Sequence, residues 1–77
     1  MNKKVEKVNS FNVVSEEGVV DMVEVFREHT NVAGKWVRGD IQMCLRSTGT
    51  HINRLKKGKY QEANSPKMFF SHSRNAL

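Results

Sequence analysis

The chain is poor in cysteine and has no long apolar run. Only Cys44 among its 77 residues is a cysteine, which excludes an intrachain disulfide and leaves a free thiol suited to a reducing compartment. No apolar run approaches the length of a membrane span, and residues 1–10 lack the apolar core of a signal peptide. We therefore expect a cytoplasmic protein with no membrane partner.

Residues suited to metal or cofactor chemistry are few and scattered. His29, His51, His72 and Cys44 form no CxxC or HxxxH pattern, and no carboxylate stands at ligand spacing from them. The glycines are spaced apart rather than gathered into a phosphate-binding loop. The sequence predicts no metal, no other cofactor and no enzymatic activity.

Positive charge is in surplus, and it is segregated along the chain. Thirteen Lys and Arg against eight Asp and Glu give a net charge of +5. Residues 15–30 carry five acids and one base, whereas residues 38–60 carry six bases and one acid. A concentrated basic segment fits a polyanionic partner. A chain of this length forms one small domain, too small to enclose an elaborate active site.

Apolar residues in the basic segment stand at helical spacing. Ile41 and Leu45 are four apart, and Ile52 and Leu55 are three apart, as one face of each of two short helices requires. The residues between the two pairs are rich in Ser, Thr and Gly, which favour a turn and the start of a new helix. Gly58, after two lysines, suits the residue that follows the second helix.

Residues 38–57, RGDIQMCLRSTGTHINRLKK, resemble a helix-turn-helix DNA-binding motif of the small phage repressor type. The resemblance implies a recognition helix from about residue 48 to residue 57 that lies in the major groove. Its exposed residues would read base edges: Thr48, Thr50, His51, Asn53 and Arg54. Basic residues around it would contact phosphates without reading sequence: Arg38, Arg46, Lys56, Lys57, Lys59 and Lys67.

The segment before the motif also has helical spacing. Val19, Met22, Val23 and Phe26 recur at helical intervals, and Ser15 precedes two acids as an N-cap would, so the longest helix is expected over residues 15–30. Trp36, the only tryptophan of so small a domain, is expected to pack in the core. The alternative is an exposed indole, next to Lys35, that stacks on a base. We interpret Cys44 as a small core residue rather than a nucleophile.

The remaining segments favour extended structure. Residues 11–14 are β-branched and aromatic, which favours a short strand. Residues 59–63 and 67–72, with turn residues between them, predict a hairpin whose Met68 and Phe70 cover the core. Residues 1–10 are interpreted as a flexible basic tail, or as an arm that follows nucleic acid, and residues 74–77 as a frayed end. The expected fold is α+β: a three-helix helix-turn-helix core with a C-terminal β-hairpin wing, over residues 11–73.

These features predict sequence-specific binding of double-stranded DNA by a small transcriptional regulator of phage or bacterial type. A homodimer on a two-fold operator would add base contacts that one small domain lacks. The alternative is a small inhibitor module that binds a host protein through the acidic helix or the apolar hairpin. RNA binding is a third reading, which the lack of aromatic residues within the basic segment disfavours.

Overall fold

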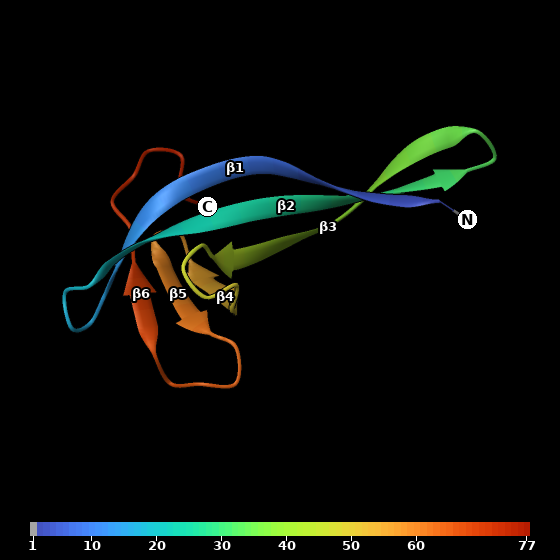
Figure 1. The fold of residues 1–77 in the computed structure, drawn as a ribbon. Helices are drawn as coiled ribbons and strands as arrows, with labels where there is room; N and C mark the ends of the chain where they lie inside the picture. Colours follow the sequence, from blue (N-terminus) through green and yellow to red (C-terminus); the bar gives the residue numbers. More distant parts are fainter. Residues whose placement is uncertain (1) are drawn as a thin grey trace.

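The computed structural model describes residues 2–77 and contains six β-strands, with no helix in that range. The strands are β1 (Lys3–Ser15), β2 (Val20–Val32), β3 (Lys35–Leu45), β4 (His51–Lys56), β5 (Lys59–Glu62) and β6 (Met68–Phe70). Each strand pairs antiparallel with the next, and β6 pairs with β1, so the sheet closes into a barrel (Figure 1).

The barrel has a small core made by alternate residues of its strands. All of the core residues but Ala76 come from strands, and Ala76 comes from the C-terminal tail. The core residues are Phe11, Val13, Val23, Val25, Leu45, Ile52, Tyr60, Phe69 and Ala76. Tyr60 and Val23 have no exposed surface, and the rings of Phe11 and Tyr60 lie 5.3 Å apart between centroids. Their alternation with exposed residues is the period of two expected for a sheet with one buried face.

The first three strands are longer than the barrel and project from it as an arm. The arm comprises residues 3–8 of β1, 26–32 of β2 and 35–42 of β3, with β2 in the middle. It extends to the right in Figure 1, where the N-terminus lies near the β2–β3 turn. The molecule is 48 Å long but only 27 by 21 Å across. The arm has no packed layer over either face, so its side chains are accessible to a partner.

The predicted helix-turn-helix, and with it the α+β fold and the winged helix, is wrong. Residues 38–57 form the end of β3, a turn and β4. Leu45 and Ile52 are buried as expected, but Ile41 and Leu55 are 43% and 51% exposed. Residues three or four apart share a helical face, whereas a strand places residues two apart on one face. The two apolar pairs therefore did not identify a helix.

The predicted long helix over residues 15–30 is also wrong, since β2 occupies most of this segment. Ser15 caps a turn: its Oγ accepts the N–H of Val19, and its carbonyl accepts the N–H of Gly18, whose φ is +83°. An N-cap and a hairpin turn use the same side-chain-to-backbone bonds. The valines of β2 favour a strand, since β-branched residues lose side-chain freedom in a helix.

The two chain ends take part in the fold. Residues 3–10, interpreted above as a tail, lie in β1; Met1, the first residue of that tail, lies outside the described residues. At the other end, Ala76 is 6% exposed and Leu77 packs against the core, so the frayed end was a wrong prediction. No helix in residues 2–77 is long and apolar enough to cross a membrane.

The predicted strand at residues 11–14 is present within β1, and the predicted C-terminal hairpin is present as β5 and β6. This hairpin closes the barrel instead of forming a wing. In β6 the buried residue is Phe69, while Met68 and Phe70 are half-buried. The sequence therefore predicted the wrong β6 residues to face the core.

Candidate nucleic-acid interface

Acidic and basic residues, which are unevenly distributed along the sequence, are also unevenly distributed between the two ends of the molecule. The antiparallel order places the β1–β2, β3–β4 and β5–β6 turns at one end, opposite the arm. We call residues 14–22, 44–51 and 61–68 the turn end and the other described residues the arm end. The turn end carries two basic and four acidic residues, net −2; the arm end carries eleven basic and four acidic residues, net +7. A polyanion is therefore attracted to the arm end.

One face of the arm continues the barrel interior, and we call it the inner face. Strand alternation and the pairing of β1 with β2 and β2 with β3 place eight side chains on it. They are Lys4, Glu6, Arg27, His29, Asn31, Trp36, Arg38 and Ile41. Three are basic and one is acidic, so the inner face has a net charge of +2.

Trp36 is the exposed aromatic residue of this face. Its side chain is 47% exposed, and the Lys4 ammonium lies 4.8 Å from its ring centroid. Trp36 was predicted to lie in the core, and this prediction is wrong because no part of the barrel lies opposite it. The Arg27 guanidinium donates to the carbonyl of Gly39 at 3.2 Å, which fixes its position beside β3. The inner face thus combines an accessible indole with fixed cations.

The side chain of His29 is largely buried on the inner face. Its ring is 14% exposed, and Nε2 has no hydrogen-bond partner among residues 2–77. The nearest acidic oxygen belongs to Glu6, 3.9 Å from Nε2. His29 thus lies between the basic residues of the inner face and its single carboxylate.

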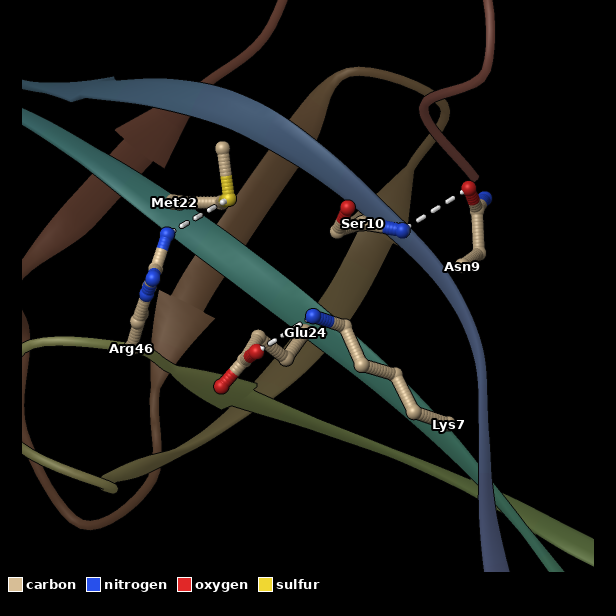
Figure 2. A network of polar contacts seen from close by, with 6 residues as sticks. All are labelled: Lys7, Asn9, Ser10, Met22, Glu24 and Arg46. Atoms are coloured by element: carbon tan, nitrogen blue, oxygen red, sulfur yellow. Dashed lines mark hydrogen bonds and ion pairs between the residues drawn. The ribbon is translucent and has the colours of Figure 1, made fainter.

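The opposite face of the arm, the outer face, is balanced in charge. Lys3 Nζ lies 3.2 Å from Glu28 Oε1, and Lys7 Nζ lies 2.7 Å from Glu24 Oε2. Figure 2 shows Lys7 reaching from β1 across β2 to Glu24. Such exposed ion pairs add little stability, but they neutralise these lysines. The outer face is therefore less suited to a polyanion than the inner face.

The β4–β5 hairpin adds a group of lysines at the arm end. Lys56 and Lys59 are directly opposite each other in the strand pairing, and Lys57 lies in the turn between them. None of the three has a carboxylate within ion-pair distance among residues 2–77. Like charges placed opposite each other destabilise a sheet, and a bound polyanion relieves that repulsion.

Arg54 links this hairpin to the barrel. It lies opposite Tyr60 in the pairing of β4 with β5 and on the same side as buried Ile52. Burial raises the pKa of the Tyr60 phenol above its usual value, while the charge of Arg54 acts in the opposite direction. The Tyr60 hydroxyl donates to the carbonyl of Leu77, which holds the tail against the hairpin.

The five residues predicted to read bases are not brought together. Thr48 and Thr50 lie at the turn end, where their hydroxyls are 2.7 Å apart, and His51 begins β4. Alternation places His51 and Asn53 on the outside of the barrel and Arg54 on the inner side. No recognition helix carries them, because this segment is a turn and a strand.

The predicted phosphate-contacting residues divide between the two ends. Arg38, Lys56, Lys57 and Lys59 lie at the arm end, and Arg46 and Lys67 lie at the turn end. The guanidinium of Arg46 lies 3.8 Å from the sulfur of Met22, as Figure 2 shows, and the ammonium of Lys67 lies 5.5 Å from the ring centroid of Phe69. The turn end also has a polar hollow of about 260 Å³ lined by residues that include Thr48, Thr50 and Lys67.

Cys44 is half-buried on the outside of β3 rather than in the core. Its Sγ lies 3.7 Å from His51 Nδ1 on β4. Burial raises the pKa of the Cys44 thiol, and the charge of Glu24 acts in the same direction. A raised pKa disfavours the nucleophilic thiolate. Within residues 2–77, no group of three or more His, Cys, Asp or Glu residues could hold a metal ion.

No protein-family model, curated protein or solved structure matches the chain, so its function is argued from its own residues. Sequence reasoning missed Lys4 and Arg27, and it gave base stacking by Trp36 only as the alternative to burial. The signal available in the sequence was Gly34, a residue that favours turns. In the structure Ala33 and Gly34 both have positive φ, as a type I′ hairpin turn requires. Valines on both sides of that turn favour strands, and a hairpin there would have placed Trp36 beside β2.

Proposed function

We propose that this protein binds nucleic acid through the inner face of the arm and the lysines of the β4–β5 hairpin. The observation that carries the proposal is the net charge of +7 at the arm end, with the exposed Trp36 among its cations. Neutralising phosphates releases counterions, which supplies sequence-independent affinity. No helix is needed for this mode of binding.

The indole of Trp36 favours a partner with unpaired bases. Every base has a flat face that stacks on an aromatic ring, and proteins that bind single strands combine such rings with a basic surface. The bases of a duplex are already stacked on one another, so Trp36 adds nothing there unless a base is displaced. Double-stranded DNA, the partner implied by the helix-turn-helix resemblance, is therefore expected to bind through phosphate contacts alone and more weakly. A cytoplasmic location belongs to this proposal, because the free thiol of Cys44 suits a reducing compartment.

The test uses the intrinsic fluorescence of Trp36, the chain's only tryptophan. A single-stranded oligonucleotide should quench it, and a duplex of equal length should bind more weakly. Four to six phosphate contacts would give a slope of log K against log salt of about −3 to −4 on a single strand. Lack of affinity for both nucleic acids at low salt would refute the proposal.

Three variants separate charge from stacking. Lys57→Ala should weaken binding and reduce the salt slope by about 0.7, because one phosphate contact is lost. Trp36→Ala, followed by anisotropy of a labelled oligonucleotide, should cost about 1–3 kcal/mol on the single strand and little on the duplex. Lys67→Ala, at the turn end, is the matched control and should leave both affinities unchanged. Weaker binding by the control alone would place the interface at the turn end.

A protein-binding role is the second candidate, and an apolar groove favours it. The groove, of about 380 Å³, lies on the outside of the barrel between β1, β2 and the tail, and Val14, Val20 and Phe70 line it. Val20 is 72% exposed, a large exposure for an apolar residue at the start of a strand. A protein partner at this groove should bind with little dependence on salt, and Val20→Asp should abolish that binding. The same variant should leave nucleic-acid affinity unchanged.

A further inference from the structure

The outer edge of β1 is unpaired over the whole arm. β1 pairs with β2 on one side from Lys3 onward, but it meets β6 only at residues 14–15. Between these points the tail covers part of the edge: the Asn75 amide donates to the carbonyl of Ser10, and the Ser71 hydroxyl donates to the carbonyl of Asn12. The covering ends near residue 9, where the Asn9 amide donates to the carbonyl of Asn75. Residues 3–7 keep a row of backbone groups available to another strand, and the row ends at Val8, where the pairing of β1 with β2 shifts register.

The side chains of this edge are arranged so that the edge can pair with itself. Lysines on an edge strand usually discourage pairing. Here Lys3 and Lys7 are neutralised within the chain by Glu28 and Glu24 on the outer face. The charges left on the inner face of β1 are one basic residue, Lys4, and one acidic residue, Glu6. These two residues are two positions apart and opposite in charge. When two such edges run antiparallel, Lys4 of one copy can therefore lie opposite Glu6 of the other, and Glu6 opposite Lys4.

We propose that a second copy of this chain pairs with β1 in antiparallel orientation about a two-fold axis at Val5. In this register Lys4 of each copy is opposite Glu6 of the other on the inner face. On the outer face the two Val5 side chains, each 66% exposed in one copy, meet. Lys3 of each copy is opposite Lys7 of the other there, and both lysines are already ion-paired with Glu28 and Glu24 of their own copy. The three-stranded arms join into one six-stranded sheet with the barrels at opposite ends. Because paired residues share a face, both inner faces lie on the same side of that sheet.

The charges select this register over its neighbours. A slip by two residues in one direction places Lys4 opposite Lys4, and a slip in the other direction places Glu6 opposite Glu6. A slip by one residue places inner-face residues of one copy on the outer face of the other. Only the register centred on Val5 gives two opposite-charge pairs on the inner face and keeps both faces consistent. Its two Lys3–Lys7 oppositions on the outer face are offset by the ion pairs of these lysines with Glu28 and Glu24.

The other free edge of the arm, on β3, is less suited to pairing. The pairing of β3 with β2 shifts register between Arg27 and His29. β3 has one extra residue at this point, between Arg38 and Ile41. Such a bulge bends the strand and interrupts the row of backbone groups, which is a common way of blocking an edge. β1 has a similar irregularity at Val8, but it lies beyond the paired residues 3–7, whereas the β3 bulge lies within the free edge of that strand. The Cβ of any residue in place of Gly39 would lie 3.0 Å from the carbonyl oxygen of Glu28, so the bulge is tightly fitted. The β1 edge is therefore the better candidate for the dimer interface.

Sedimentation equilibrium of the full chain, without nucleic acid, tests the proposal through charge exchange. The wild type should dimerise reversibly. Lys4→Glu and Glu6→Lys should each raise the dimer dissociation constant about tenfold or more, because each creates two like-charge pairs. The double variant Lys4→Glu/Glu6→Lys should regain wild-type affinity, and an equimolar mixture of the two single variants should form a mixed dimer with both pairs complementary.

Further measurements keep the result decisive. Denaturation of each variant at monomer concentration should show that the barrel is folded. Asp40→Lys, on the β3 edge, is the matched control and should not change dimerisation. Amide hydrogen exchange of residues 3–7 should slow as protein concentration rises, and this readout needs no variant. A wild type that stays monomeric, a double variant that fails to recover, or a dimer sensitive only to Asp40→Lys would overturn the proposal.

Discussion

Gly58, in the turn between β4 and β5, is a position where alanine should be poorly tolerated. Its φ is +82°, a region that residues with a Cβ adopt at a cost. A Cβ built there would lie 2.7 Å from the carbonyl oxygen of Ser71, which is backbone and cannot rotate away. The carbonyl of Gly58 also accepts the N–H of Ser71 at 2.9 Å. An alanine must therefore push the tail away from the hairpin.

The loss of unfolding free energy expected for Gly58→Ala has two sources, the backbone conformation and the contact with Ser71. The left-handed conformation costs roughly 1–2 kcal/mol for a residue with a Cβ, and the loss of chain freedom in the unfolded state offsets about 0.4–1 kcal/mol of it. Displacing Ser71 weakens a hydrogen bond worth about 0.5–1.5 kcal/mol and loosens the packing of buried Ala76. We expect Gly58→Ala to lower the free energy of unfolding by about 2–4 kcal/mol, a large share for a domain of this size.

Urea denaturation followed by the fluorescence of Trp36 or by circular dichroism measures this loss. Gly49→Ala is the matched control, because Gly49 has φ +71° and no atom within 4 Å of a built Cβ. The control carries only the conformational cost, about 1 kcal/mol. Equal losses in the two variants would mean that the tail does not press on the hairpin, and the reasoning from the Ser71 contact would be wrong.

Three further predictions concern the barrel. Leu45→Ala and Ile52→Ala should each cost about 2–5 kcal/mol in urea denaturation, because both residues are 4% exposed in the core; unchanged midpoints would contradict that packing. The raised pKa of Tyr60 means that the folded state holds this proton more tightly, so stability should be complete below the unfolded value near 10.0 and should fall as pH rises through the folded value. Tyr60→Phe should lack this alkaline loss, and a variant that loses stability as steeply as the wild type would refute it. Cys44 should react with a thiol reagent at pH 8 more slowly than an unhindered cysteine, because its pKa is raised; a faster reaction would show an activated thiolate.

The sequence by itself determined several local features of the fold. It predicted the hairpin of β5 and β6 from turn residues between two stretches, and the strand at residues 11–14 from β-branched and aromatic residues. It also identified Leu45 and Ile52 as buried. These features depend on local chemistry, which is the same whether the neighbouring segments are helices or strands.

The choice between helix and strand was not determined locally. The apolar residues of β2 fit a helical stripe through Val19, Met22, Val23 and Phe26, yet the structure buries Val23 and Val25 at a spacing of two. Ser15 can satisfy backbone N–H groups in a helix cap or in a turn equally well. Closure of the barrel favours strands over helices, because only extended strands bring the N-terminal half and the C-terminal half of the chain into one closed sheet.

The candidate site was even harder to predict from the sequence than the strands. The basic surplus was evident, but which cations share a face depends on the strand register, and Lys4 and Trp36 are 32 positions apart in the chain. Their meeting requires the pairing of β1 with β2 and of β2 with β3. The exposure of Trp36 depends on a mismatch of lengths: β1, β2 and β3 have 13, 13 and 11 residues, whereas β4, β5 and β6 have 6, 4 and 3. A side chain is buried only where another layer lies opposite it, and the short strands cover only the barrel, so the surplus length of the first three strands becomes an uncovered arm.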